Sequence, residues 1–191
     1  MPKILAFAGS LRAESLNHKL LLAAATLEGV GDAEFTICRL RDYDLPVYDA
    51  DYEAEHGLPE HAVQLKALFK SHDALLMACP EYNGSVTAAW KNAIDWVSRP
   101  AEGERRLECF ENKVAALLAA SPGGLGGLRG LAHVRTILSG VGVLVIPQQF
   151  ALPKAHEAFD GEGRFRDPAT AERALPVVRA LIRVSGGLTG S

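Results

Sequence analysis

Cysteine is scarce in this chain of 191 residues: three are present, Cys38, Cys79 and Cys109, and none forms a Cys-x-x-Cys pair. Because two of them lie inside apolar runs, we expect buried thiols, no disulfide framework and a cytoplasmic location. The chain also lacks an uninterrupted apolar run of about 18 residues, so no membrane span is predicted. The apolar run near Met1 is too short for a signal peptide.

An excess of charge of one sign is missing as well. The chain carries 20 Lys and Arg residues against 23 Asp and Glu residues, a formal net charge of −3. No basic face is evident that would attract nucleic acid or an anionic membrane. The strongly acidic balance of a protein that steers toward redox partners is missing too. The 6 histidines are scattered without ligand spacing, so no metal site is predicted.

Two well-known phosphate-binding motifs are absent. The sequence has no G-x-x-x-x-G-K-[ST], which argues against a nucleotide triphosphatase. No G-x-G-x-x-G follows the first apolar run, and the glycines at 123–130 do not reproduce that spacing. A dinucleotide-binding domain of Rossmann type is therefore disfavoured.

Strand and helix signals alternate along the chain. Five short apolar runs predict strands at 4–8, 35–40, 74–79, 114–120 and 141–146. Helical patterns follow at 15–29, 60–71, 85–98, 125–139 and from 167 onward. This alternation predicts a doubly wound α/β fold with a parallel sheet between two helical layers, formed by one domain over 1–191. The pattern alone fits both a five-stranded order and a Rossmann-type order.

Several local signals make sharper predictions. Ser15 and Ser85 are predicted to cap helices. Pro176 is expected to kink or split the last helix. Trp90 and Trp96 lie six residues apart on one predicted helix, so one of them should point away from the sheet. Either the acidic loop from Arg41 to Pro59 or a second subunit should cover it.

The loop after the first strand carries the residues that a phosphate group needs. Ser10, Ser15 and Asn17 offer neutral donors, and Arg12 adds a charge. The first turn of the following helix offers free backbone N–H groups and the positive end of its dipole. Read alone, the same residues also fit a capped helix with a solvated arginine.

Two further loops follow the third and fourth strands. In the first of these, Pro80 and the pair Asn83-Gly84 predict a rigid turn, and Tyr82 could cover one face of a ring system. In the second, glycines that follow Ser121 would let the backbone approach a ligand closely. Because loops after parallel strands emerge at one edge of the sheet, we expect all three loops to form one site.

Together these loops resemble the NADPH-dependent FMN reductase family. The matching motifs are G-S-L-R-x-x-S-x-N at 9–17, P-E-Y-N-G-S at 80–85, K-N-A-I-D-W at 91–96 and S-P-G-G-x-G-G at 121–127. Leu45-Pro-Val-Tyr-Asp-Ala-Asp51 also looks like the long second loop of the family. The likeness covers about residues 3–150, with Trp90 where the family usually has leucine.

The resemblance implies a flavodoxin-like strand order of 2-1-3-4-5 and non-covalent FMN. It also implies a homodimer or homotetramer. The cofactor-binding residues that we predict are Ser10, Arg12, Ser15, Leu16, Asn17, Pro80, Glu81, Tyr82, Asn83, Gly84, Ser121, Gly123 and Gly124.

The implied activity is hydride transfer from NADPH or NADH to FMN, followed by transfer of two electrons to a small acceptor. Quinones, chromate, azo compounds, nitro compounds and free flavin all fit an open flavin face. Hydride transfer needs no side-chain acid or base, so no catalytic residue is predicted. The alternatives are an electron carrier of flavodoxin type and, with little support, a hydrolase using Ser10, His156 and Asp160.

Overall fold

The computed structural model describes residues 1–189 and contains one parallel sheet. Its strands are β1 (Lys3–Ala8), β2 (Glu34–Arg39), β3 (Ala74–Ala78), β4 (Val114–Ala120) and β5 (Leu144–Leu152). They lie in the order β2-β1-β3-β4-β5, which confirms the flavodoxin-like order implied by the resemblance.

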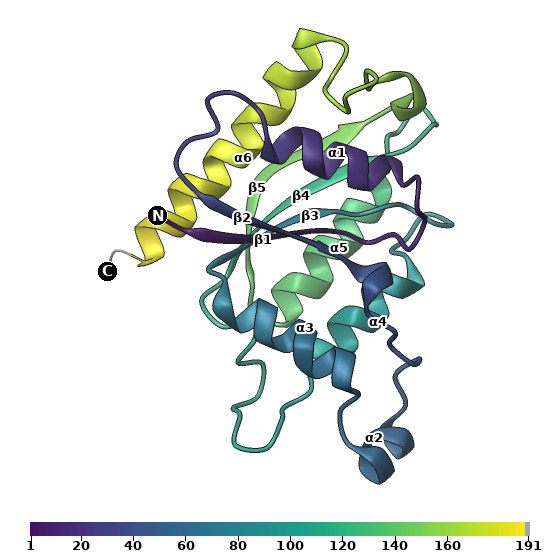
Figure 1. Cartoon of the computed structure of the whole chain (residues 1–191), viewed down its shortest axis with the longest axis vertical. Coiled ribbons are helices and arrows are strands. Elements are labelled where there is room, and N and C mark those ends of the chain that lie inside the picture. Colours follow the sequence, from purple (N-terminus) through teal and green to yellow (C-terminus); the bar gives the residue numbers. More distant parts are fainter. Residues whose placement is uncertain (190–191) are drawn as a thin grey trace.

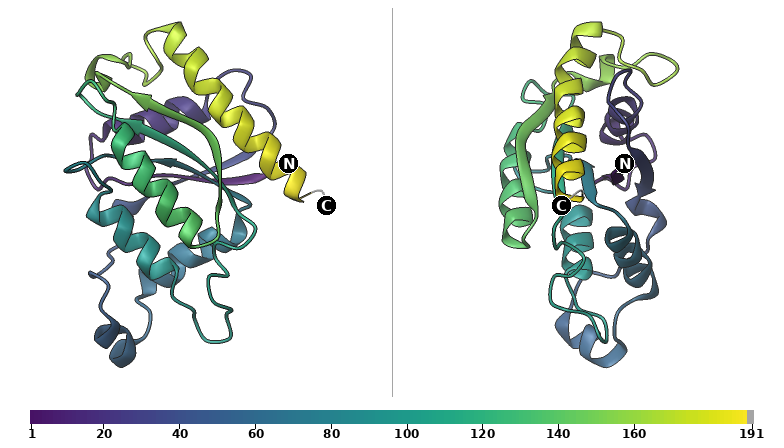
Figure 2. Two further views of the ribbon diagram at one scale, coloured as in Figure 1. Left: turned by 180° about the vertical axis from the view of Figure 1, so that it is seen from behind. Right: turned by 90° about the vertical axis from the view of Figure 1, so that its left-hand side faces the viewer.

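The helices form a layer on each face of the sheet. They are α1 (Leu16–Ala25), α2 (Ala50–His56), α3 (Glu60–Ser71), α4 (Ala88–Val97), α5 (Leu128–Gly140) and α6 (Pro168–Thr189), with short 3-10 turns η1 (Leu40–Asp42) and η2 (Ala155–Glu157). Helices α1 and α6 cover one face, and α3, α4 and α5 cover the other (Figures 1 and 2). Because both faces are covered, β3 and β4 are buried along their whole length, as their apolar sequences require.

Two of the expected boundaries are wrong. Strand β5 begins at Leu144, since Val141 ends α5 and Gly142 turns the chain with φ +89°. It continues through Pro147, which an edge strand tolerates because one of its sides has no strand to pair with. Thr87, rather than Ser85, caps α4: its hydroxyl accepts from the Trp90 N–H. Ser85 instead closes a tight turn with Tyr82.

Helix α6 begins at Pro168, as predicted for a proline at the first helical position. Pro176 does not split it, because the helix runs as one element from Pro168 to Thr189. In Figure 2 this helix crosses the back of the sheet as a single long rod.

Both tryptophans of α4 are buried within this chain, so the one that points away from the sheet does not need a second subunit to cover it. Trp90 packs in the core beneath β1, where the exposed fraction of its side chain is 1%. Trp96 donates from its indole N–H to the Pro46 carbonyl at 2.7 Å and meets Tyr48 and Tyr52 edge-on. The acidic loop therefore provides the cover, and helix α2, which the sequence did not predict, forms its end (Figure 1).

Candidate functional site

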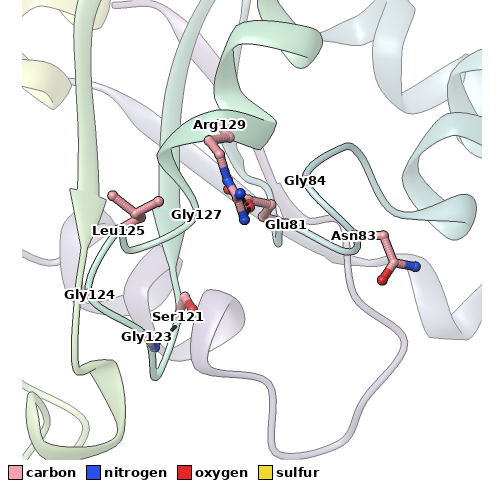
Figure 3. Close-up of a pocket in the computed structure, with 9 residues that line it drawn as sticks. All are labelled: Glu81, Asn83, Gly84, Ser121, Gly123, Gly124, Leu125, Gly127 and Arg129. Atoms are coloured by element: carbon pink, nitrogen blue, oxygen red, sulfur yellow. Dashed lines mark hydrogen bonds and ion pairs between the residues drawn. The ribbon is translucent and has the colours of Figure 1, made fainter.

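The loops that follow β1, β3 and β4 meet at the carboxyl edge of the sheet and enclose two adjoining cavities. The larger has a volume of about 470 Å³ and lies between the second and third loops (Figure 3). The smaller, of about 80 Å³, lies between the first loop and the other two. Glu81 and Ser121 line both cavities, so together the two form one continuous site.

Every residue predicted to bind the cofactor lines one of these cavities. The smaller cavity contains Ser10, Arg12, Ser15, Leu16, Asn17, Pro80, Glu81, Tyr82 and Ser121. The larger contains Glu81, Asn83, Gly84, Ser121, Gly123 and Gly124. The sequence therefore located the lining correctly, whereas the role of each residue in binding stays a prediction.

The first loop leads into α1 as an anion site requires. Ser15 caps the helix, since its hydroxyl oxygen accepts from the His18 N–H at 3.2 Å. Among the described residues, the N–H groups of Leu16 and Asn17 have no protein partner. Such first-turn groups, with the helix dipole behind them, favour a phosphate. Arg12 lies in the same loop and forms no ion pair with any described residue.

Asn17 lines the smaller cavity, but its side-chain amide is bonded within the protein. Its buried side-chain amide donates to the Ala120 carbonyl at 2.8 Å, and its amide oxygen accepts from the Ala120 N–H at 2.9 Å. This pair of bonds fastens the start of α1 to the end of β4. The side chain therefore fixes the distance between the first and third loops, and its backbone N–H remains the group available to an anion.

The second loop is the tight turn that the sequence predicted. Asn83 (φ +52°) and Gly84 (φ +77°) occupy its two central positions, and Tyr82 and Ser85 exchange backbone hydrogen bonds at 3.0 Å. Both left-handed residues fit a turn of type I′. Tyr82 extends from this turn with 49% of its side chain exposed, on the rim of the smaller cavity.

Glu81 and Arg129, which both line the larger cavity, form an ion pair with each other (Figure 3). One Glu81 oxygen accepts from Arg129 Nε at 2.7 Å and the other from the Gly130 N–H at 3.2 Å. Burial opposes ionisation of Glu81, but these hydrogen bonds outweigh it and lower the pKa of its carboxyl. Arg129 was not among the residues predicted from the sequence, although an arginine at the start of the helix after the glycine loop was a readable signal.

Cys79 precedes the second loop and is buried, with a thiol that burial holds at a raised pKa. A buried, protonated thiol is a poor nucleophile, so this cysteine belongs to the core. Asp160, the acid of the hydrolase alternative, uses its carboxylate to accept from the N–H groups of Glu162 and Arg164 in its own loop. The hydrolase alternative therefore gains no support from the structure.

Comparison with known proteins gives consistent matches across the chain. The family profile described as NADPH-dependent FMN reductase matches residues 2–157. An NAD(P)H-dependent FMN reductase of Pseudomonas aeruginosa is 35% identical over 181 residues, covering 94% of this chain and 92% of the relative. A probable NADPH:quinone oxidoreductase of Oryza sativa is 32% identical over 182 residues, covering 94% and 86%.

Among solved structures, FerB of Paracoccus denitrificans, a flavoenzyme NAD(P)H:(acceptor) oxidoreductase, superposes with a TM-score of 0.80. It is 31% identical and covers 98% of each chain. An FMN-dependent NADH-azoreductase of Bacillus anthracis in complex with FMN has a TM-score of 0.56 at 14% identity, covering 97% of this chain and all of the other, which supports the fold alone.

Proposed function

The chain belongs to the NADPH-dependent FMN reductase family, an enzyme family of oxidoreductases, and on that premise we propose that it binds FMN at the carboxyl edge of its sheet and reduces quinones with NAD(P)H. One observation carries the proposal. The start of α1, which is suited to bind a phosphate, adjoins a wider cavity lined by glycines at the same edge of the sheet. An electron carrier of flavodoxin type is not favoured, since the relatives are named as enzymes.

The donors present fit the two ends of FMN. For the phosphate, the first loop provides Arg12, the hydroxyls of Ser10 and Ser15, and the free N–H groups of Leu16 and Asn17. For the flavin ring, glycines from two loops form part of the lining of the larger cavity: a Cβ added to Gly124 or Gly84 would meet no atom within 4 Å. A planar ring can therefore lie against the backbone there.

The remaining predicted residues complete this arrangement. Pro80, Glu81 and Tyr82 lie where the two cavities join, with the Tyr82 ring on the rim. The N–H groups of Asn83, Gly84 and Gly124 have no protein partner among the described residues and can donate to the polar edge of the ring. Such donors stabilise negative charge that develops on reduction.

Bound FMN would supply two-electron chemistry, accepting hydride from NADPH or NADH and passing the electrons to the acceptor. The chain itself holds and exposes the ring. The Glu81–Arg129 ion pair ties the second loop to α5, and Thr87 ties it to the first loop by donating to the Gly9 carbonyl at 2.6 Å. Rigid loops keep the ring face open to a planar donor. No side-chain acid or base is assigned.

Quinones are the acceptors that we propose first, because several relatives are named for quinone reduction. Chromate, azo compounds, nitro compounds and free flavin are further candidates for the same open face. We also propose a single domain over 1–191, a cytoplasmic location and a homodimer or homotetramer. No described helix is long and apolar enough to cross a membrane. Because Trp96 is covered within the chain, it gives the oligomer no support, and sedimentation at micromolar concentration tests it directly.

The decisive test is anaerobic stopped flow on the FMN-loaded protein. We expect NADPH or NADH to bleach the yellow colour within seconds and an added quinone to restore it at once. Bleaching by dithionite but by neither nicotinamide would overturn the reductase proposal and favour an electron carrier. Repeating the second mixing step with chromate, an azo dye and free FMN would rank the acceptors.

A further inference from the structure

A cluster of three positive side chains lies beside the phosphate loop, and two of them, Arg39 and Arg41, have no part in the function proposed above. Arg12, Arg39 and Arg41 line a small cavity together with Ser10 and His18. They come from separate elements: Arg12 from the first loop, Arg39 from the end of β2 and Arg41 from η1. Register places Arg39 opposite Ala8, so the carboxyl end of β2 lies next to the start of the first loop.

None of these arginines forms an ion pair with a described residue. No carboxylate lies within ion-pair distance of any of the three guanidinium groups, whereas Glu14, the nearest acidic residue in the loop, is paired with Lys19 at 2.9 Å. All three arginines are exposed, so solvent screens the repulsion between them, but together they offer several charged donors to an anion at this cavity. Such a cluster is typical of a site for a phosphate or carboxylate ligand.

His18 gives the cluster a fixed geometry. It is buried in the first turn of α1, and its Nε2 accepts from Arg39 Nε at 3.1 Å. An accepting Nε2 is unprotonated, and burial together with the Arg39 charge lowers the pKa of His18, with Asp42 acting in the opposite direction. His18 therefore orients Arg39 without adding a charge, and the terminal nitrogens of Arg39 stay free for a ligand.

The cavity shares Ser10 and Arg12 with the phosphate end of the FMN site but does not include Ser15, Leu16 or Asn17. Arg39 and Arg41 thus lie beyond the FMN phosphate, on the side of β2. The nucleotide half of a dinucleotide whose nicotinamide stacks on the flavin ring lies outside the ring cavity. The carboxyl edge of the parallel sheet continues from that cavity past β1 to Arg39 and Arg41 on the side of β2. The only group that NADPH has and NADH lacks is a 2′-phosphate, which is a phosphomonoester dianion.

Resting on the proposed function, we propose that Arg39 and Arg41, with Arg39 oriented by His18, bind the 2′-phosphate of NADPH and make this enzyme selective for NADPH over NADH. Arg12 remains with the FMN phosphate and separates the two anions. Charge-assisted hydrogen bonds of this kind contribute enough for about a 10- to 150-fold difference in affinity.

The first experiment uses the parent holoenzyme and measures binding without catalysis. Calorimetry of the FMN-loaded protein should show that 2′,5′-ADP, which carries the 2′-phosphate, binds at least about tenfold more tightly than 5′-AMP. Equal affinity for the two nucleotides would overturn the proposal. This readout holds even if neither nicotinamide reduces the flavin, a result that would refute the proposed function separately.

The second experiment replaces both arginines. In Arg39→Ala/Arg41→Ala the KM for NADPH should rise about 10- to 150-fold, while the KM for NADH and the Kd for FMN change less than about twofold. The control Arg106→Ala/Arg183→Ala removes the same charge at exposed positions before β4 and in α6, neither of which lines the three cavities, and should change neither nicotinamide constant. His18→Phe should show a smaller loss for NADPH alone, as expected of a positioning residue.

Three results would contradict the assignment. If FMN binding weakens while the ratio of the KM values for NADPH and NADH stays unchanged, the arginines bind the FMN phosphate instead. An equal loss for both nicotinamides would show a general electrostatic effect. If neither KM value nor the Kd for FMN changes, Arg39 and Arg41 are solvated surface residues that bind no ligand. If the alanine double variant fails to fold, Arg39→Gln/Arg41→Gln gives the same comparison, because glutamine keeps the length and polarity of the side chain.

Discussion

The loop after β4 contains two pairs of glycines that differ in the space around them. A Cβ on Gly126 would lie 2.7 Å from the carbonyl carbon of Leu152, and one on Gly127 would lie 2.9 Å from the Ala119 Cβ. In contrast, a Cβ on Gly123 would come no closer than 3.5 Å to Ser121 Oγ, and one on Gly124 would meet nothing. A side chain at the first pair would collide with the fold, whereas one at the second pair would have room, although Gly127 also lines the larger cavity. Elsewhere in the site we likewise distinguish framing residues, which are packed or bonded within the protein, from cavity residues, which have no such partners.

Replacing the framing glycine should have the largest effect on stability. Gly126→Ala forces a side chain into a left-handed position (φ +63°) and against the backbone of β5. We expect the free energy of unfolding to fall by about 3–5 kcal/mol. The matched Gly124→Ala should change it by less than about 0.5 kcal/mol. Urea denaturation of both variants measures this, and equal losses would erase the distinction between the two pairs.

Asn17 lines the smaller cavity, yet its hydrogen bonds to Ala120 also make it a framing residue. Asn17→Ala removes two buried hydrogen bonds, one to the N–H and one to the carbonyl of Ala120. The free energy of unfolding should fall by about 2–4 kcal/mol. Ser10→Ala, a change at a neighbouring residue that lines the same cavity, should lower the free energy of unfolding by less than about 0.5 kcal/mol. The comparison fails if the Asn17 variant unfolds at the denaturant midpoint of the parent.

Arg12 should show the reverse behaviour. Its guanidinium has no ion-pair partner among the described residues, so Arg12→Ala should change the stability of the FMN-free protein by less than about 0.5 kcal/mol. Loss of a charge-assisted bond to phosphate should weaken FMN binding by about 1.5–3 kcal/mol, or roughly 10- to 150-fold. Fluorescence titration measures the Kd, and an unchanged Kd would place the phosphate elsewhere.

Glu81 should give a smaller, pH-dependent effect. Its pKa is lowered in the folded state, so its contribution to stability is present above its unfolded pKa of about 4.5 and is lost as the pH falls below that value. Near pH 7, Glu81→Gln should destabilise the protein by about 1 kcal/mol, because the Arg129 side chain is 65% exposed and screened. Denaturation midpoints at pH 7 and pH 3 should differ less in the variant than in the parent.

Much of the fold could be predicted because its signals are local. Strands β3 and β4 are continuous apolar runs between turn residues, and Ser15 caps α1 as its position indicates. Strand β5 was placed too early because its apolar pattern breaks at Pro147, Gln148 and Gln149, which only an edge position permits. Helix α2 was missed because none of its residues is buried, so its sequence has no apolar stripe.

The lining of the site could also be predicted, but the partners of each side chain could not. Parallel strands direct the loops to one edge, which is why all the predicted residues line the two cavities. The bonds of Asn17 to Ala120, the ion pair of Glu81 with Arg129 and the approach of Arg39 to the first loop join segments far apart in the chain. No local pattern specifies such pairs.

The most direct test of the account is a titration of the cofactor-free protein with FMN and, separately, with FAD. Quenching of flavin fluorescence should show one FMN bound for each chain, and the Arg12→Ala variant should weaken that binding while leaving the fold intact. FAD should bind far more weakly, because the first loop offers a phosphate site but no second loop of the kind that would receive an adenylate. Absence of FMN binding, or preference for FAD, would show that this sheet edge is not an FMN site.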